Sequence, residues 1–427
     1  MGRTVSALVT CDDDYLGAVG PFGVDIPWWA EAEPVAARLR EVLGVPVIVL
    51  RLLRVDGGDG SRDGHVTYHV AALSRPAPGL LADGPAVPAD VRAELDVTDE
   101  RRSPWARLDG VLELLGWASD VLAAARRHVT GAAVQRKAWN LAALFQLPTG
   151  PAPVWLKATP RFAADEASVI AAFARVDPSL VPSVISAGPG RVLLEHLPGE
   201  DCWDASPEII TSAVSRLATA QAALASRLSA PSGSDLAGSD LAGSSLAGSS
   251  LAGLPDRRSP VIAGQIRALL DGPVAGELSA GEAAAARGLL SRFAWLDQCG
   301  LPDTVVHGDF HPGNWRSDGG PPAVVDWADA HLGNPVLDGL RTCDFLPAAR
   351  RPAAAQAWVE TWAACVPGCD PARALRIAEP LAHLAYAVRY QEFLDGIEPS
   401  ERVYHRGDPA AAIRAALRSA ADGAQAG

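Results

Sequence analysis

The segment 305–327, which reads VVHGDFHPGNWRSDGGPPAVVDW, constrains this chain more than any other part of it. Its apolar start predicts a short strand, and the polar run that follows predicts a loop. Asn314 follows Asp309 by five residues within that loop. A second apolar run, Ala323-Val324-Val325, predicts another strand that ends at Asp326. One loop and one strand end are therefore predicted to present two carboxylates and a carboxamide.

These groups suit phosphoryl transfer from ATP. The reaction needs one carboxylate to orient the attacking hydroxyl, and an Asn and a second carboxylate that hold Mg²⁺ on the phosphates. Asp309 is the candidate for the first role, and Asn314 and Asp326 are the candidate metal ligands. Mg²⁺ takes few protein oxygens and completes its shell with phosphate and water, so such a pair suffices.

The segment resembles the aminoglycoside phosphotransferase family, the small-molecule branch of the kinase-like fold. The resemblance rests on His307-Gly308-Asp309 with Asn314, on the Asp-Trp pair at 326–327, and on Gly333-Asn334-Pro335-Val336-Leu337-Asp338. It implies that Asp309 orients or deprotonates a substrate hydroxyl and that His307 braces the loop. It also implies that Asp338 ties the following helix to that loop. For His311, a substrate contact and a packing role both stay open.

Lysine is rare here: of 37 basic residues only Lys137 and Lys157 are lysines. Lys157 lies in the apolar run Val154–Ala158, which predicts a strand. A kinase places its ATP-phosphate lysine on such a strand, as a compact point charge. Lys157 is therefore the candidate for the phosphate-binding lysine, and a chance lysine at a sheet edge is the alternative.

The family resemblance also implies a glutamate that pairs with this lysine. Glu166 lies nine residues after Lys157, near the predicted start of a helix at 163–175, and Asp165 is its rival. An acidic first turn that only complements the helix dipole is the alternative for both residues.

Two further stretches resemble nucleotide-binding parts of the family. The turn at 137–142 stands where a glycine-rich loop would lie, and Asn140 is its candidate phosphate contact. The stretch 191–197 resembles the hinge between lobes, where backbone groups of Glu195, His196 and Leu197 would hold the adenine. Asp326-Trp327-Ala328 replaces the D-F-G of protein kinases, which indicates a small substrate.

Two other functions compete with an ATP- and Mg²⁺-dependent phosphotransferase. The first is a non-catalytic nucleotide-binding module of the same fold, against which the presence of all the catalytic residue types argues. The second is a metal hydrolase built on His307, Asp309 and His311. That cluster leaves Asn314, Asp326 and Lys157 unexplained.

Composition narrows the class of protein. With 48% hydrophobic residues and a mean hydropathy of +0.10, the chain can bury a core. A net charge of −13 disfavours a nucleic-acid partner, and no apolar run is long enough to span a membrane. The six cysteines show no disulfide or metal pattern, so we expect reduced thiols in a cytoplasmic protein. The family resemblance implies a small-molecule hydroxyl acceptor as the partner. The sequence says nothing of its oligomeric state.

We expect an α+β, two-lobed protein-kinase-like fold, with a small antiparallel sheet lobe and a larger helical lobe, preceded by a small α/β region. The expected boundaries are residues 1–100 for the N-terminal region, 101–200 for the small lobe with the hinge, and 201–427 for the helical lobe. The repeat SDLAG-SDLAG-SSLAG-SSLAG at 234–253 predicts a flexible loop, at 231–256, because its five-residue period fits neither helix nor strand.

Overall fold

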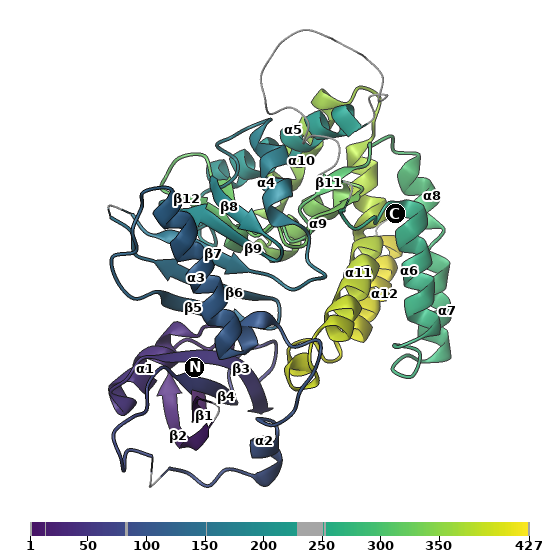
Figure 1. Cartoon of the computed structure of the whole chain (residues 1–427). Coiled ribbons are helices and arrows are strands. Elements are labelled where there is room, and N and C mark those ends of the chain that lie inside the picture. The colour runs from purple at the N-terminus through teal and green to yellow at the C-terminus, as the bar shows by residue number, and fades with distance from the viewer. Residues whose placement is uncertain are drawn as a thin grey trace. The chain divides into compact units, whose positions relative to one another are not determined.

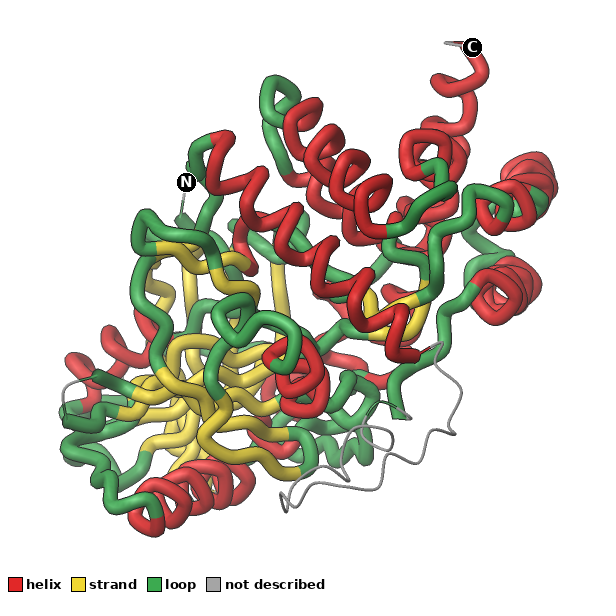
Figure 2. Tube along the Cα trace, turned by 90° about the horizontal axis from the view of Figure 1, so that it is seen from above, coloured by secondary structure: helices red, strands yellow, loops and turns green. Residues whose placement is uncertain are grey.

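The computed structural model describes residues 2–12, 14–81, 84–150, 152–228, 251 and 253–425. The chain divides into two compact units: unit 1 comprises residues 1–162, 185–196 and 392–406, and unit 2 comprises the rest. Most strands lie in unit 1 and most helices in unit 2 (Figures 1 and 2). The expected α+β class is confirmed. Most of the predicted loop at 231–256 lies outside the described residues.

The described elements of unit 1 are β1 (Arg3–Cys11), β2 (Asp14–Val24), α1 (Glu33–Leu43), β3 (Val47–Asp56), β4 (His65–Ala72), α2 (Ala89–Ala93), α3 (Leu108–Ala124), β5 (Val134–Trp139), β6 (Ala142–Leu147), β7 (Val154–Ala158), β8 (Val184–Gly188) and β9 (Arg191–Glu195), with short 3-10 turns at Pro104–Ala106 and Pro399–Tyr404.

The described elements of unit 2 are α4 (Glu166–Ala174), β10 (Glu200–Asp201), α5 (Pro207–Leu228), α6 (Ser259–Asp271), α7 (Ala280–Leu289), α8 (Arg292–Asp297), β11 (Thr304–Val306), β12 (Trp315–Ser317), β13 (Ala323–Val324), β14 (His331–Gly333), α9 (Val336–Phe345), α10 (Arg351–Cys365), most of α11 (Pro371–Gly396) and α12 (Asp408–Gln425), with a 3-10 turn at Pro312–Asn314.

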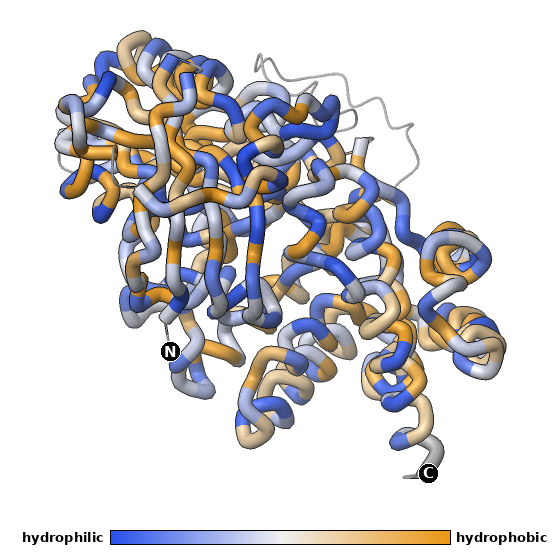
Figure 3. The backbone as a smooth tube through the Cα atoms, turned by 90° about the horizontal axis from the view of Figure 1, so that it is seen from below, coloured by the Kyte–Doolittle hydropathy of each residue, from blue (hydrophilic) through white to orange (hydrophobic). Residues whose placement is uncertain are grey.

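The N-terminal sheet has the strand order β2-β1-β4-β3, in which β1 and β4 run parallel and the other neighbours antiparallel. Strand β3 is apolar on both faces because each face packs into a different core. Val49 and Leu52 join the core under α1, whereas Ile48 and Leu50 join a second core that contains α3 and β6. Figure 3 shows the apolar stretches of the strands in orange.

The second sheet of unit 1 has the order β5-β6-β7-β9-β8. Its core residue Phe145 is fully buried in the same cluster as Ile48 of the N-terminal sheet. The buried Gln135 side chain joins the two sheets, because it accepts from the Val49 N–H at 2.9 Å and donates to the Val49 carbonyl at 2.7 Å. The structure therefore groups residues 1–100 with the small sheet, across the expected boundary at residue 100.

Local chemistry explains some of the element boundaries. Residues 134–147 form the antiparallel hairpin of β5 and β6. The helical stretch 280–297 is broken between α7 and α8. There the Ser291 hydroxyl donates to the Gly288 carbonyl at 3.0 Å and competes with the helical ladder. Strand β2 was missed because Gly17 and Gly20, both at positive φ, mask its pattern.

The structure can be compared with the expectations about the cysteines and about membrane-spanning helices. All six cysteines are free thiols, as predicted. Among the described helices, none has the length and apolarity that crossing a membrane requires.

A buried carboxyl gives unit 1 a testable pH dependence. Burial, with the Glu398 carboxylate beside it, raises the pKa of Glu401 to about 8, although Glu401 accepts from the Leu52 N–H at 3.1 Å. The unfolded chain loses this proton near pH 4.5 and the folded chain only near pH 8. The free energy of unfolding should therefore fall by about 1.4 kcal/mol per pH unit between these values and be level above them. Glu401→Gln should remove that slope in melting curves.

Comparing wild type with Glu401→Gln separates the effect of Glu401 on stability from the effects of other titrating groups. Burial lowers the pKa of His69 to about 3. The stability that the neutral ring contributes is therefore lost as the pH falls below the pKa of His69 in the unfolded chain, and this loss is the same in wild type and in Glu401→Gln. Parallel stability profiles for wild type and Glu401→Gln from pH 5 to 8 would contradict the prediction.

Candidate active site

The loop after β11 is braced from inside by its histidine. The Asp309 N–H donates to His307 Nδ1 at 3.2 Å, so the ring hydrogen is on Nε2, which lies 3.0 Å from the Val325 carbonyl. Gly308 has φ +87°, and a Cβ there would lie 2.3 Å from the Asp329 carbonyl oxygen. The sequence His-Gly-Asp thus fixes the loop against the strand end that carries Asp326.

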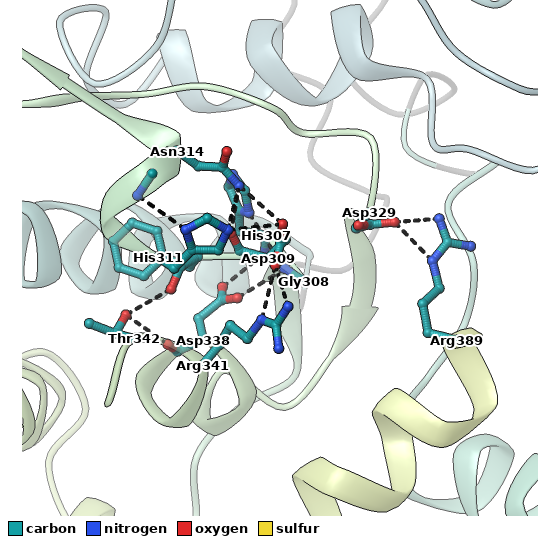
Figure 4. Close-up of polar contacts among 12 residues, drawn as sticks. His307, Gly308, Asp309, His311, Asn314, Asp329, Asp338, Arg341, Thr342 and Arg389 are labelled. Carbon is teal, nitrogen blue, oxygen red and sulfur yellow. Dashed lines mark hydrogen bonds and ion pairs between the residues drawn. The ribbon is translucent and has the colours of Figure 1, made fainter. Parts of the chain in front are cut away.

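Asp309 lies half-buried at the centre of a hydrogen-bonded cluster (Figure 4). Its Oδ1 accepts from Arg341 Nε at 2.9 Å and from Arg341 NH2 at 2.8 Å. Its Oδ2 accepts from Asn314 Nδ2 at 3.1 Å and lies 3.3 Å from His311 Nε2. Burial alone would raise the pKa of Asp309, but the Arg341 guanidinium and the His311 ring hold it far below its usual range. The carboxylate is therefore ionised at neutral pH.

The candidate metal ligands lie next to this carboxylate. Asn314 Nδ2 also donates to the Asp309 carbonyl at 2.9 Å, which fixes the amide so that its Oδ1 faces away from Asp309. The Val325 N–H donates to the Asn314 carbonyl at 2.9 Å and brings the next residue, Asp326, beside the loop. Asp326 is exposed and has the rare φ of +65° for a side chain with a Cβ. Such strain is found where a structure holds a functional group in place.

The residue after Asp326 anchors this strand end. Trp327 is fully buried between the rings of His307 and Phe173, and its indole N–H donates to the Val324 carbonyl at 3.0 Å. Its backbone N–H donates to Glu166 Oε1 at 2.9 Å. A tryptophan in place of the kinase Phe therefore packs the turn firmly.

Glu166 and Asp165 take different roles at the start of α4. Asp165 caps the helix, because its Oδ1 accepts from the Ser168 N–H at 3.4 Å. Glu166 is buried and reaches the Trp327 backbone, so it holds the segment that carries Asp326. Its pairing with Lys157 stays a prediction.

The two lysines of unit 1 have opposite environments. Lys137 is exposed and lies 3.3 Å from Glu31. Lys157 is buried on β7, where it is in register with Leu144 on one neighbouring strand and Val192 on the other. A charged group in such a place needs a counter-charge, which agrees with a special role for Lys157.

Asn140 has partners inside unit 1. It is buried, its Nδ2 donates to the Glu401 carbonyl at 3.2 Å, and its Oδ1 lies 3.4 Å from His405 Nε2. These contacts give the side chain a structural role in holding the 3-10 turn at 399–404. We therefore assign Asn140 to that turn and not to a phosphate contact.

The predicted hinge coincides with a unit boundary. The chain passes from unit 1 to unit 2 between His196 and Leu197. The side chains before that point bind within unit 1: Glu195 accepts from Arg127 NH1 at 2.5 Å, and His196 Nδ1 accepts from the Trp155 indole at 3.1 Å. These contacts leave the backbone groups of 195–197 for an adenine, and that contact stays a prediction.

The geometry does not support the metal-hydrolase alternative. Both ring nitrogens of His307 are committed to backbone groups of the protein. Among the described residues, no group of three or more His, Cys, Asp or Glu side chains is arranged to hold a metal ion.

The sequence model of the phosphotransferase enzyme family (APH) matches residues 151–375, just over half of the chain. The chain belongs to this phosphotransferase family. The matched range contains Lys157, Glu166, Asp309, Asn314 and Asp326, and it excludes Asn140. The resemblance that the catalytic segment carries is confirmed, and it makes the chain a member of a family of small-molecule phosphotransferases.

Solved structures of phosphotransferases resemble the chain over most of their own length. A candidate fructosamine-3-kinase from Thermobifida fusca is 22% identical, with a TM-score of 0.48, over 70% of this chain and 98% of its own. A choline/ethanolamine kinase family protein from Mesorhizobium loti is 16% identical, with a TM-score of 0.46, over 72% and 98%. A macrolide 2'-phosphotransferase from Brachybacterium faecium is 18% identical, with a TM-score of 0.45, over 69% and 97%. No curated protein sequence matches significantly.

The sequence prediction missed two charged side chains at or near the candidate site, Arg341 and Asp329. Arg341, which donates twice to Asp309, was not among the candidates. Its position three residues after Asp338 on α9 was the available signal, since residues three apart lie on one helix face. Asp329 was missed in the same way, and it accepts from Arg389 Nε of α11 at 2.8 Å (Figure 4).

Proposed function

We propose that this chain transfers the γ-phosphoryl group of ATP, in the presence of Mg²⁺, to a hydroxyl group of a small molecule. Asp309 would orient the hydroxyl, Asn314 and Asp326 would hold the metal, and Lys157 would bind the ATP phosphates. An aminoglycoside, aminosugar, sugar or amino alcohol is the proposed class of acceptor.

The observation that carries this proposal is the contact between Asp309 and Asn314. Because Asn314 Nδ2 donates to Asp309, its Oδ1 is left to a cation, and the same contact holds the Asp309 carboxylate beside that position. An Asn and an Asp oxygen are hard ligands that suit Mg²⁺, and the carboxylate next to them can accept from a hydroxyl. The two roles are thus supported by one hydrogen-bonded unit.

The chain's residues fit a loose, in-line displacement. The acceptor O–H would donate to Asp309, which aligns the oxygen lone pair with the phosphorus atom. As the new O–P bond forms and the bond to the ADP oxygen breaks, the hydroxyl proton passes to Asp309 or to the transferred phosphate and then to water. Because the pKa of Asp309 is so low, we propose that it mainly orients the hydroxyl rather than removing its proton early. Bound ATP would supply the phosphoryl group, and the Mg²⁺ bound with it would offset the negative charge of the phosphates.

The acceptor side of Asp309 is aromatic. The His311 ring stacks on Trp203 at 5.2 Å and on Phe345 at 4.5 Å between centroids. Trp203 and Phe345 are 41% and 38% exposed, so both rings reach the surface next to His311. We propose that the acceptor approaches Asp309 past these two rings, so His311 would contact it as well as brace the loop.

The role of Lys157 can be tested against the only other lysine. Lys157→Met keeps most of the side-chain stem but removes the charge, so the Kd for Mg·ATP should rise by about 10- to 100-fold, the cost of losing charged hydrogen bonds. Lys137→Met should leave the Kd unchanged, because that lysine pairs with Glu31 at an exposed site. Titration calorimetry with a non-hydrolysable ATP analogue measures both. Equal Kd values for Lys157→Met and wild type would exclude the proposed role.

A further inference from the structure

Helix α9 holds the catalytic loop through three residues on one of its faces. Asp338, Arg341 and Thr342 are spaced i, i+3 and i+4, so they project from the same side of the helix. The carboxylate of Asp338 accepts from the N–H groups of His307 and Gly308, at 2.8 and 2.9 Å. The Thr342 hydroxyl donates to the Phe310 carbonyl at 3.0 Å. Backbone contacts thus fix the residues on both sides of Asp309 (Figure 4).

Arg341 supplies the contact that these two residues cannot make. Asp309 is the loop residue between their targets, and Arg341 binds its side chain with Nε and NH2, both on the same oxygen. Even with its backbone fixed, an aspartate side chain can still rotate about χ1 and χ2, because more than one value of these torsions is favourable. Two N–H groups of a planar guanidinium restrict this rotation more than a single donor would.

The guanidinium is itself held in place. Its central carbon lies 4.5 Å from the ring centroid of Phe345 and 4.5 Å from that of Tyr386. Stacking of a cation on aromatic faces is favourable and fixes the plane of the guanidinium. Only 17% of the Arg341 side chain is exposed, so the contact to Asp309 is shielded from water and salt.

We propose that Arg341 is a positioning residue for phosphoryl transfer, which acts by fixing the rotamer of the Asp309 carboxylate. With Oδ1 bound by Arg341, the carboxylate presents Oδ2 toward Asn314 and His311, where a hydroxyl can reach it beside the metal ligands. The expected effect of Arg341 on catalysis rests on the proposed function. The expected effect of Arg341 on the rotamer of Asp309 does not.

The first test measures kinetics in variants of Arg341. Arg341→Gln should lower kcat by about 100-fold, the usual consequence of a misplaced catalytic group. The Kd for Mg·ATP analogue should stay within about twofold of wild type, since Arg341 acts through Asp309. Arg341→Lys should recover part of kcat, because a lysine keeps the charge but lacks the two parallel donors. Arg376→Gln, at an exposed site on α11, is the matched control and should keep wild-type kcat.

A double-mutant cycle with Asp309→Asn separates positioning from a direct role. If Arg341 acts through the carboxylate, Arg341→Gln should cost less than about threefold in the Asp309→Asn background. A cost of about 100-fold in both backgrounds, or a matching loss of nucleotide affinity, would overturn the proposal.

A crystal structure of Arg341→Gln gives a readout that needs no acceptor. We expect Asp309 to leave its present rotamer or to occupy two rotamers, with an unchanged loop backbone. An Asp309 side chain that keeps the wild-type rotamer would overturn the proposal whatever the kinetics. Absence of phosphoryl transfer by the wild type would instead contradict the proposed function, and the crystal structure would still decide the role of Arg341.

Discussion

Replacing Asp309 with alanine should lower kcat by about 10³-fold or more, because the hydroxyl loses the carboxylate that orients it. The metal site should be affected less. Asn314 loses the side-chain acceptor for its Nδ2 but keeps the Asp309 carbonyl, so its Oδ1 can still face a cation. Steady-state rates of ADP release with an acceptor, together with the Kd for a Mg·ATP analogue, measure both effects.

A second aspartate nearby provides the control for this variant. Asp318 lies in the exposed turn between β12 and β13, where its Oδ1 is 3.4 Å from the Gly320 N–H. Asp318→Ala should keep kcat and Kd near wild type. If Asp309→Ala retained wild-type kcat at normal stability, Asp309 would not be the residue that orients the hydroxyl.

The largest loss of stability is expected for Asp338→Ala. The buried Asp338 carboxylate accepts from the N–H groups of His307 and Gly308 and from Gln221 Nε2, at 2.7 to 2.9 Å. Burial raises the pKa of Asp338, although these donors lower it in part. Removing the carboxylate leaves the buried N–H of His307 and the partly buried N–H of Gly308 without an acceptor, at about 1–3 kcal/mol each. We expect a loss of about 3–5 kcal/mol in the free energy of unfolding, measured by urea denaturation.

A surface carboxylate gives the comparison for Asp338. Glu360 on α10 is exposed and accepts a single hydrogen bond from Gln356, so Glu360→Ala should change stability by less than about 1 kcal/mol. A similar small loss for Asp338→Ala would mean that the loop does not depend on α9. Wild-type activity of a stably folded Asp338→Ala protein would likewise mean that the loop does not depend on α9.

Regular patterns made much of the fold predictable from the sequence. Helix α5 at Pro207–Leu228 is one example, because its apolar residues recur at helical spacing and a proline marks its start. The grouping of residues 1–100 with the small sheet was not predictable. It depends on Ile48 and Phe145 sharing a core and on Gln135 reaching Val49, contacts between residues about 90 positions apart.

The candidate site was predictable where its chemistry is local in sequence. Asp309 and Asn314 lie five residues apart and are hydrogen-bonded, and Asp326 follows a residue bound to Asn314. Arg341 was not predicted, because its spacing from Asp338 shows only that the two residues share a helix face, and not that Arg341 reaches Asp309. The structural role of Asn140 also depends on a distant segment, the turn at 399–404.

Phosphoryl transfer to a hydroxyl is tested most directly by looking for the phosphorylated product. The purified protein would be incubated with Mg·ATP and pools of aminoglycosides, aminosugars, sugars and amino alcohols, and each pool analysed by mass spectrometry and ³¹P NMR. We predict a phosphate monoester of one acceptor, formed together with ADP, absent when EDTA removes the metal and absent with Asp309→Ala. A protein that binds Mg·ATP but forms no phosphorylated product from any of these hydroxyl compounds would contradict the proposed reaction and its acceptor class.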